Sequence, residues 1–281
     1  MPFAIKKLGE GKMISPLRGK FKLNDTTFVR DNKRMLYDVM LGGNGPLGID
    51  TERTFELAGP REFLYFNPED VTSAIVTCGG LCPGLNDVIR SIVMESWYRY
   101  GSKKIFGIRY GYSGLHPDTK FPPIELTPDI VRSIHMDGGS ILASSRGGTD
   151  DMDKLVDTLE RLNINILYTI GGDGTLKGAH RIAEMAQTRN LNLSVVGIPK
   201  TIDNDISYIQ RSFGFETAFS MAVNAVTSAH TEAKGAPNGI GLVKLMGRNS
   251  GFIAANATLA MNDVNYVFVP EVPFELEGEN G

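Results

Sequence analysis

Short apolar runs, each followed by a glycine-rich or polar loop and then by a segment with helical spacing, recur along this chain from residue 71 onward. The runs expected to form strands are residues 74–77, 104–108, 165–170 and 193–198. They are apolar without alternation, which is typical of parallel strands that are buried on both faces. The pattern therefore predicts an α/β fold, with a parallel sheet covered by helices on both faces.

The rest of the pattern predicts the elements between and beyond these strands. Helices are expected over residues 31–41, 86–100, 217–231 and 250–260, and over a segment that residues 149–151 cap and that ends near residue 162. One more helix is expected to start at residues 127–129, and another follows the glycine-rich loop at 171–175 and ends near residue 188. Short strands are expected at 140–143, 239–245 and 266–269. Residues 1–70 are less regular. They are interpreted as an N-terminal extension that packs against the main domain, with a flexible arm as the alternative.

Composition narrows the class of protein. The chain has 281 residues, 42% of them apolar, which is enough to bury a substantial core. Its formal charge of −3 and the lack of a dominant basic segment argue against nucleic acid as a partner. No stretch approaches the ~20 apolar residues of a membrane span. The two cysteines, Cys78 and Cys82, are too few for a structural zinc site and are expected to be reduced and buried. A soluble cytoplasmic protein is the prediction.

Two loops that carry carboxylates follow two of the predicted strands. Asp173 lies in Gly-Gly-Asp-Gly-Thr and could offer the hard oxygen ligand that magnesium prefers. Thr201, Asp203 and Asp205 lie in the next such loop, where Asp203 could accept a proton from a substrate hydroxyl. Because ligands bind at the carboxyl ends of parallel strands, both loops are expected to face one cleft and to favour phosphoryl transfer. Solvated loops with Asp-Gly or Asx turns are the alternative.

Further loops after strands could contribute to an anion site. The glycine-rich loop around Gly79 joins the first strand to its helix, and its backbone N–H groups suit a phosphate, although a tight turn would look the same. Arg146, Lys200 and Arg248 also follow predicted strands. Together they could neutralise the charge of a phosphoryl group in transfer.

Three motifs, in this order and spacing, resemble the 6-phosphofructokinase family. They are Gly-Gly-Asp-Gly-Thr at 171–175, Pro-Lys-Thr-Ile-Asp-Asn-Asp at 199–205 and Met-Gly-Arg at 246–248, and the similarity runs from about residue 58 to residue 273. The resemblance implies a phosphofructokinase-like three-layer α/β fold. It also implies ATP-dependent transfer of the γ-phosphoryl group to the C1 hydroxyl of fructose 6-phosphate, with Mg²⁺.

The resemblance assigns parts of the chain and single residues to this reaction. Residues 1–70 would be the N-terminal extension, 71–200 the nucleotide-binding α/β domain and 201–281 a partial substrate-binding α/β domain. Asp203 would be the base, with Thr201 and Arg248 stabilising the moving phosphoryl group. The nucleotide site would comprise Gly79, Arg146, Gly147, Gly172, Asp173, Gly174 and Thr175, with Asp173 holding the metal. The sugar site would comprise Thr201, Ile202, Asp203, Met246, Gly247, Arg248 and Glu271.

Two positions bear on the choice of phosphoryl donor. Gly174 resembles the ATP-using branch, because pyrophosphate users typically carry Asp there, which would crowd and repel the α-phosphate of a nucleotide. Lys200 resembles the pyrophosphate users, since bacterial ATP enzymes usually have Gly at that place. The combination, with residues 55–61, is similar to a plant- and protist-like group of ATP enzymes. ATP is therefore the expected donor, and pyrophosphate is the alternative.

Members of the family continue past the position of Gly281, so the second domain is expected to be incomplete in this sequence. A truncated, non-catalytic nucleotide-binding or regulatory subunit is therefore a second reading. The strand expected before Met246 begins Gly239-Ile240, where family members often present an Arg to a neighbouring subunit. The resemblance implies a homo-oligomer, either a dimer or a tetramer.

Overall fold

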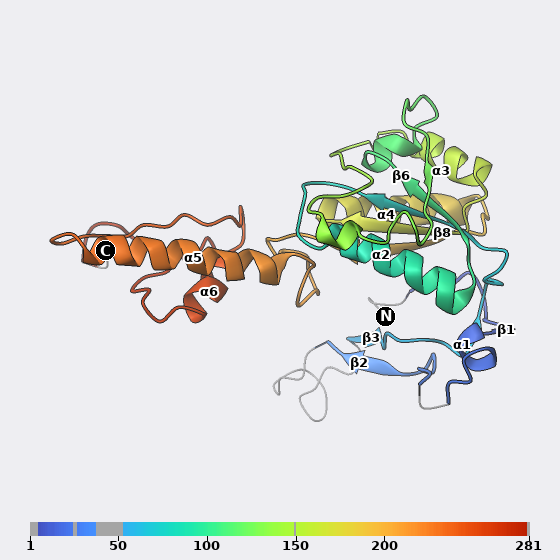
Figure 1. Cartoon of the computed structure of the whole chain (residues 1–281), viewed down its shortest axis with the longest axis horizontal. Coiled ribbons are helices and arrows are strands. Elements are labelled where there is room, and N and C mark those ends of the chain that lie inside the picture. The colour runs from blue at the N-terminus through green and yellow to red at the C-terminus, as the bar shows by residue number, and fades with distance from the viewer. Residues whose placement is uncertain (1–4, 25–26, 38–52, 149, 280–281) are drawn as a thin grey trace.

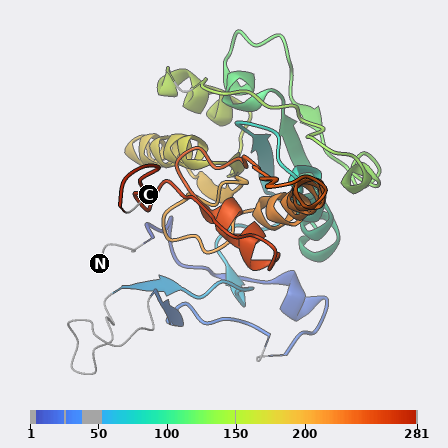
Figure 2. The ribbon, with the colours of Figure 1, turned by 90° about the vertical axis from the view of Figure 1, so that its left-hand side faces the viewer.

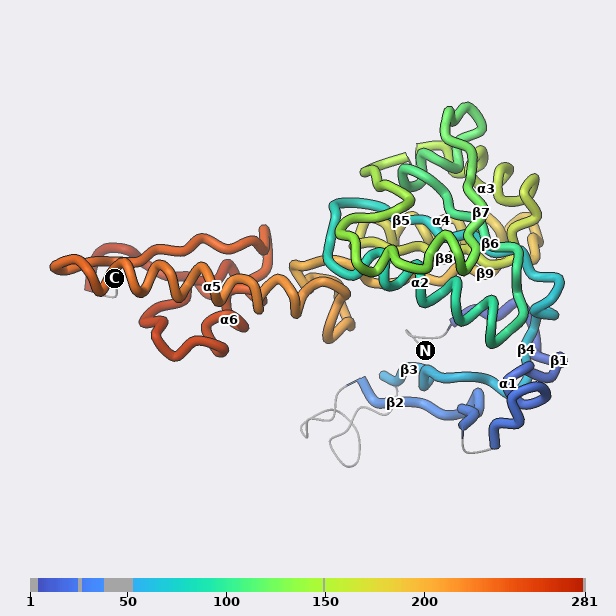
Figure 3. The backbone as a smooth tube through the Cα atoms, viewed as in Figure 1, coloured from blue at the N-terminus to red at the C-terminus, as the bar shows by residue number. Residues whose placement is uncertain are grey.

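The computed structural model describes residues 5–24, 27–37, 53–148 and 150–279. An α/β body forms the centre, the N-terminal extension lies along one side of it, and the C-terminal part projects as an elongated arm (Figures 1 and 3). Seen end-on in Figure 2, the arm points toward the viewer in front of the sheet. Within the described residues, no helix combines the length and apolar character that crossing a membrane requires.

The body is built on a five-stranded sheet with the order β7-β6-β5-β8-β9. Its strands are β5 (Thr72–Thr77), β6 (Lys104–Ile108), β7 (Ile124–Glu125), β8 (Ile166–Gly171) and β9 (Ser194–Pro199). All neighbours pair in parallel except β7, which lies antiparallel at one edge. The central strand β5 is buried along its whole length. The four strands expected from the apolar runs are confirmed.

Helices cover the sheet on both faces. They are α2 (Leu85–Met94), which continues as the π-helix η1 (Glu95–Tyr100), α3 (Met152–Arg161) and α4 (Asp173–Thr188). Two further helices, α5 (Phe215–Lys234) and α6 (Phe252–Leu259), lie in the arm and pack on each other. Val76 of β5 packs in one buried cluster with α3 and α4, while Ile75 packs in another with α2. Because successive strand residues point to opposite faces, a single apolar run supplies both cores. The expected α/β fold with three layers is confirmed.

The N-terminal extension is made of short pairs of strands. β1 (Met13–Ile14) pairs with β4 (Phe63–Leu64), β2 (Arg34–Leu36) pairs with β3 (Thr54–Glu56), and the single-turn helix α1 (Pro16–Gly19) follows β1. The Arg99 guanidinium of η1 lies 5.0 Å from the ring of Phe21, so the extension docks on the body. The helix expected at 31–41 is wrong for its described part, which pairs as a strand, and residues 38–41 lie outside the described residues.

Four further predictions of secondary structure are wrong. Residues 127–133 form turns before the 3₁₀-helix η3 (Ile134–Met136), with one helical hydrogen bond from Val131 N to Thr127 O, and residues 140–143 also form a turn rather than a strand. Residues 239–245 and 266–269 form no strand. A strand needs a neighbour for its backbone groups, and Ile240 and Leu242, 90% and 87% exposed, have no strand beside them in the described chain. Residues 201–279 therefore contain helices and loops but no sheet.

Candidate active site

A cavity of about 450 Å³ opens at the carboxyl ends of β5, β8 and β9. The loops that follow these three strands form its wall, together with the loop that ends at Arg248. Its lining residues are Cys78, Gly79, Gly80, Leu81, Cys82, Tyr112, Ser145, Arg146, Gly147, Gly172, Gly174, Thr175, Lys200, Thr201, Ile202, Asp203, Met246 and Arg248. Three of the lining side chains are cationic and one is a carboxylate. This combination suits an anionic ligand that meets a polar reaction partner.

The loop after β5 turns back at Gly79 and is tied to the segment that carries Arg146. Gly79 has φ +85°, a conformation that favours glycine. Its N–H donates to the Ser145 carbonyl at 2.9 Å, and the Ser144 hydroxyl donates to the Gly79 carbonyl at 2.7 Å. These bonds place Arg146 and Gly147 at the same side of the cavity as Gly79.

In the turn from β8 into α4, the position that requires glycine is Gly171, which does not line the cavity. A Cβ added to Gly171 would lie 2.2 Å from Thr175 Oγ1, so the first turn of α4 packs directly on the end of β8. The buried Tyr112 holds this turn by donating its hydroxyl to the Thr175 carbonyl at 2.8 Å. A Cβ added to Gly174 would meet nothing within 4 Å. Open space therefore lies beside Gly174.

Asp173 occupies the first position of α4 between two lining glycines, but its side chain is not among the lining groups. Its carboxylate pairs with Lys177 at 2.7 Å and is 60% exposed. Asp203 lines the cavity, whereas the expectation that the Asp173 carboxylate faces the same cleft stays a prediction.

Lys200 connects two of the loops from inside the protein. Its backbone N–H donates to the Gly171 carbonyl at 2.9 Å, and its Nζ donates to the Gly80 carbonyl at 2.7 Å. The residue is only 4% exposed. Burial is the main cause that lowers the pKa of the Lys200 amine. This ammonium thus fixes the loop after β5 against the end of β8 as well as lining the cavity.

The 200–213 loop carries Thr201 and Asp203. The Thr201 hydroxyl accepts from the Asp203 N–H at 3.1 Å, and the Asp203 carbonyl accepts from the Ser250 hydroxyl at 2.8 Å. Burial, and then the negative charge of Asp205, raise the pKa of the Asp203 carboxyl, while Arg248 lowers it. A carboxylate with a raised pKa, next to cations and open to a cavity, is a suitable proton acceptor.

Asn204 closes this loop from within. It is buried and has φ +54°, a left-handed conformation that asparagine tolerates better than most residues. Its side-chain oxygen accepts from the Ser212 N–H at 2.8 Å, and its amide donates to the Gln210 carbonyl at 3.0 Å. The Ser212 hydroxyl in turn donates to the Thr201 carbonyl at 2.6 Å. Sequence reasoning missed Asn204, although an asparagine between two aspartates was a signal for a turn.

Most of the predicted site residues come together in this cavity, and three do not. Asp173, Gly247 and Glu271 lie outside the lining. Both carboxylate oxygens of Glu271 accept from the Gly251 N–H at the start of α6, at 2.8 and 3.0 Å. Lining residues that the sequence did not single out for binding are Cys78, Gly80, Leu81, Cys82, Tyr112 and Ser145. Both cysteines are free and buried, as expected.

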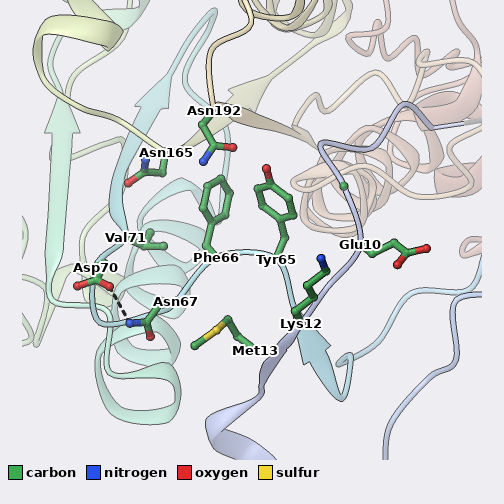
Figure 4. Close-up of a pocket in the computed structure, with 11 residues that line it drawn as sticks. Glu10, Lys12, Met13, Tyr65, Phe66, Asn67, Asp70, Val71, Asn165 and Asn192 are labelled. Carbon is green, nitrogen blue, oxygen red and sulfur yellow. Dashed lines mark hydrogen bonds between the residues drawn. The ribbon is translucent and has the colours of Figure 1, made fainter.

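A second cavity, of about 680 Å³, lies at the opposite ends of the strands, between the extension and the body. Asn165 and Asn192 contribute from the segments that lead into β8 and β9. The rings of Tyr65 and Phe66 stand side by side in it, with centroids 5.0 Å apart (Figure 4). It shares no residue with the cavity at the carboxyl ends, which is where a parallel sheet places its ligands.

Comparison with known proteins gives one consistent family. A family model described as Phosphofructokinase matches residues 72–279. The ATP-dependent 6-phosphofructokinase of Borreliella burgdorferi is 52% identical over 283 residues, which cover 100% of this chain and 63% of that protein. The ATP-dependent 6-phosphofructokinase of Amycolatopsis methanolica is 44% identical over 282 residues, covering 99% of this chain and 61% of that protein. This chain thus spans somewhat over half the length of these relatives.

Solved structures agree on the fold. Pichia pastoris phosphofructokinase in the T-state matches with a TM-score of 0.63 and 24% identity, over 74% of this chain and 23% of that one. The pyrophosphate-dependent phosphofructokinase of Marinobacter aquaeolei matches with a TM-score of 0.59 and 19% identity, over 73% of this chain and 54% of that one. The matched model, the relatives and the shared fold all give the same result: this chain belongs to the phosphofructokinase family.

Proposed function

We propose that this chain carries the donor site and the catalytic base of an ATP-dependent 6-phosphofructokinase. The reaction would transfer the γ-phosphoryl group of ATP to the C1 hydroxyl of fructose 6-phosphate. The observation that carries the proposal is the composition of the cavity at the carboxyl ends of the strands. It brings Asp203 together with the cations Arg146, Lys200 and Arg248.

Asp203 is proposed to take the proton of the C1 hydroxyl. The freed oxygen would attack the γ-phosphorus, the bond from that phosphorus to the β,γ-bridging oxygen would break, and ADP would leave with its electron pair. Thr201 and Arg248 would stabilise the charge on the phosphoryl oxygens in transfer. Most of the rate acceleration would come from positioning and fixed charge. Ile202, Met246, Gly247 and Glu271 are proposed to complete the sugar side.

The nucleotide is proposed to lie along the glycine-bearing loops. Gly79, Gly172 and Gly174 would let the backbone approach the phosphates, with Arg146 and Gly147 opposite and Thr175 beginning α4. The N-terminus of α4 adds backbone N–H groups and a positive dipole end, which favour phosphate.

The residues of this site fit a Mg²⁺ ion that is held jointly by a carboxylate and by the phosphates of a bound nucleotide. Mg²⁺ is commonly held by one or two carboxylates together with substrate phosphates. Asp173 offers one exposed carboxylate between two lining glycines, and the described residues contain no group of three acidic, His or Cys side chains that could hold a metal alone. To hold the ion, the Asp173 carboxylate would give up its ion pair with Lys177. The bound Mg²⁺ would neutralise part of the phosphate charge. Calorimetry, after subtraction of Mg²⁺ binding to free ATP, should therefore detect additional Mg²⁺ binding to the protein–ATP complex and none to the protein alone, and Asp173→Asn should weaken that additional binding.

ATP is proposed as the donor in preference to pyrophosphate. The open space beside Gly174 supports this choice, because a donor longer than pyrophosphate needs room there. Lys200 is the feature that favours pyrophosphate. A coupled assay that offers each donor with fructose 6-phosphate separates the two, and turnover with pyrophosphate alone would overturn the choice of ATP.

The test of the base uses Asp203→Asn, which keeps the shape of the side chain. We expect the rate of turnover to fall by at least about 10²-fold, since a positioned base contributes about that much. Calorimetric affinity for ATP should change little, because the amide does not alter the nucleotide loops. Unchanged turnover in this variant would remove Asp203 from the role of base.

A second candidate is a subunit that binds nucleotide without turnover. It is favoured by the open sugar side, where Met246 is 71% exposed and the expected strand at 239–245 is not formed. Binding of ATP without turnover in the same two assays would support it. A cytoplasmic homo-oligomer, dimer or tetramer, is proposed from the family alone. Analytical ultracentrifugation would test the assembly, and a fluorescent fusion in the source cell would test the location.

A further inference from the structure

The tip of the 200–213 loop is in contact with the N-terminal extension. The ring of Tyr208, at this tip, lies 5.1 Å from the ring of Tyr37 and 6.3 Å from the ring of Phe55, measured between centroids. Tyr37 and Phe55 lie 6.0 Å apart, and all three pairs meet edge to face. Tyr37 follows β2 and Phe55 lies in β3, which pack below the body in Figure 1. The three rings form what we call the aromatic cluster.

The backbone at Tyr208 points to a loop that is held in place. Its φ of +66° is a left-handed conformation, which is unusual for a bulky residue and persists only where surrounding contacts enforce it. Tyr208 is 54% exposed, so burial in a core does not enforce it. The edge-to-face contacts with Tyr37 and Phe55 are of the kind that favours one fixed arrangement of rings.

The two ends of the loop are fixed by different means. Phe213 N–H donates to the Pro199 carbonyl at 3.0 Å, and the Ser212 hydroxyl donates to the Thr201 carbonyl at 2.6 Å. Inside the loop, Asn204 bonds Ser212 and Gln210. The loop is thus closed at its base by hydrogen bonds and supported at its tip by rings from another part of the chain. Asp203 lies between these two supports.

We propose that Tyr37 and Phe55 of the N-terminal extension are positioning residues for Asp203, acting through Tyr208. This inference rests on the proposed function, because it assigns the extension a part in the phosphoryl transfer. Neither residue lines the cavity at the carboxyl ends. Their effect would come from holding the 200–213 loop in the conformation that aims the carboxylate at the substrate hydroxyl. Small displacements of such a group reduce the rate of the chemical step more than they reduce binding.

The experiment compares Phe55→Ala and Tyr208→Ala with two controls in the full chain. Tyr208→Phe keeps the ring contacts. Tyr98→Ala removes a tyrosine of similar exposure, 58%, which makes no ring contact within the described residues. We expect kcat for fructose 6-phosphate to fall about tenfold in both alanine variants, from the loss of ring contacts, with KM for ATP nearly unchanged. Tyr98→Ala should behave as the unmodified chain, and Tyr208→Phe, which keeps the ring, should lose less of kcat than Tyr208→Ala. The double variant should be no worse than either single one, because both remove the same support.

Hydrogen exchange of the amides in residues 204–213 is the second readout, and it does not depend on turnover. We expect faster exchange at Ser212 in Phe55→Ala and Tyr208→Ala, a smaller change in Tyr208→Phe and unchanged exchange in Tyr98→Ala. If the unmodified chain itself does not turn over substrate, the proposed function fails. The hydrogen-exchange rates then test by themselves whether the aromatic cluster holds the 200–213 loop. Unchanged exchange in the alanine variants would overturn the inference. So would an equal loss in Tyr98→Ala, which would show general destabilisation.

Discussion

Asn204 offers a sharp test of what holds the 200–213 loop, because its role can be divided into two parts. Replacement by alanine removes the acceptor of the buried Ser212 N–H and the donor to the Gln210 carbonyl. A buried donor left without a partner costs about 1–3 kcal/mol, while the exposed Gln210 can turn its carbonyl to water. Alanine also tolerates the φ of +54° less well than asparagine, by about 1 kcal/mol. We therefore expect Asn204→Ala to lower the free energy of unfolding by about 2–4 kcal/mol.

The chain contains a matched control for the backbone part. Asn190, after α4, has the same φ of +54°, but its side chain is exposed and makes no hydrogen bond within the described residues. Asn190→Ala should thus cost about 1 kcal/mol, from conformation alone. Asn204→Gly should be more stable than Asn204→Ala by a similar amount, since glycine accepts positive φ. Urea unfolding of the variants measures all three values.

Either of two results would contradict this role of the Asn204 side chain. One is an Asn204→Ala variant within about 0.5 kcal/mol of the unmodified chain, the range of ordinary surface substitutions. The other is equal losses for Asn204→Ala and Asn190→Ala. Either would mean that the hydrogen bonds to Ser212 and Gln210 add nothing to the stability of the loop.

Four further predictions concern the cavity and the loops around it. Gly171→Ala should cost about 1–3 kcal/mol in urea unfolding, since its Cβ would overlap the first turn of α4, whereas Gly174→Ala, with open space, should be neutral; equal effects would contradict the packing at Gly171. Because burial and then Asp205 raise the pKa of Asp203, the acidic limb of kcat/KM should lie above the ordinary range of an aspartate, and Asp205→Asn should shift it to lower pH. The same raised pKa disfavours the carboxylate in the folded state. Asp203→Asn should therefore gain stability that is fully present above the raised pKa of the folded protein and is lost as pH falls from that pKa to the ordinary aspartate pKa, and a gain that does not change with pH in this window would count against it. Burial raises the pKa of the Cys82 thiol to about 11, so it should resist iodoacetamide at pH 8 and react in urea.

The aromatic cluster shows that the N-terminal extension also contacts the 200–213 loop. Sequence reasoning found no chemistry in residues 1–70, and the fold brings two of their rings against the loop that carries Asp203. A contact between residues 55 and 208 has no local signal, because neither neighbouring sequence nor spacing encodes it.

Local sequence patterns were enough to predict the sheet and most of the residues that line the cavity. The runs at 74–77 and 165–170 are short, apolar and without alternation, which is typical of strands covered on both faces, and ligand loops follow such strands at one edge of the sheet. This is why Gly79, Asp203 and Lys200 could be placed in one site from local pattern alone. The Asp151 cap of α3 was predictable for the same reason, because capping depends on neighbours a few residues away.

The other features depend on contacts between distant segments, and the strands that were wrongly predicted show the physical reason. Residues 239–245 have the composition of a strand, but a strand exists only where another strand satisfies its backbone, and none lies there among the described residues. Glu271 bonds the start of α6, and Lys200 bonds Gly80 across 120 residues of chain. Pairing partners, the direction of a side chain and burial depend on segments distant in sequence. Local propensity therefore fixed which segments carry the chemistry, and packing fixed which of their side chains meet.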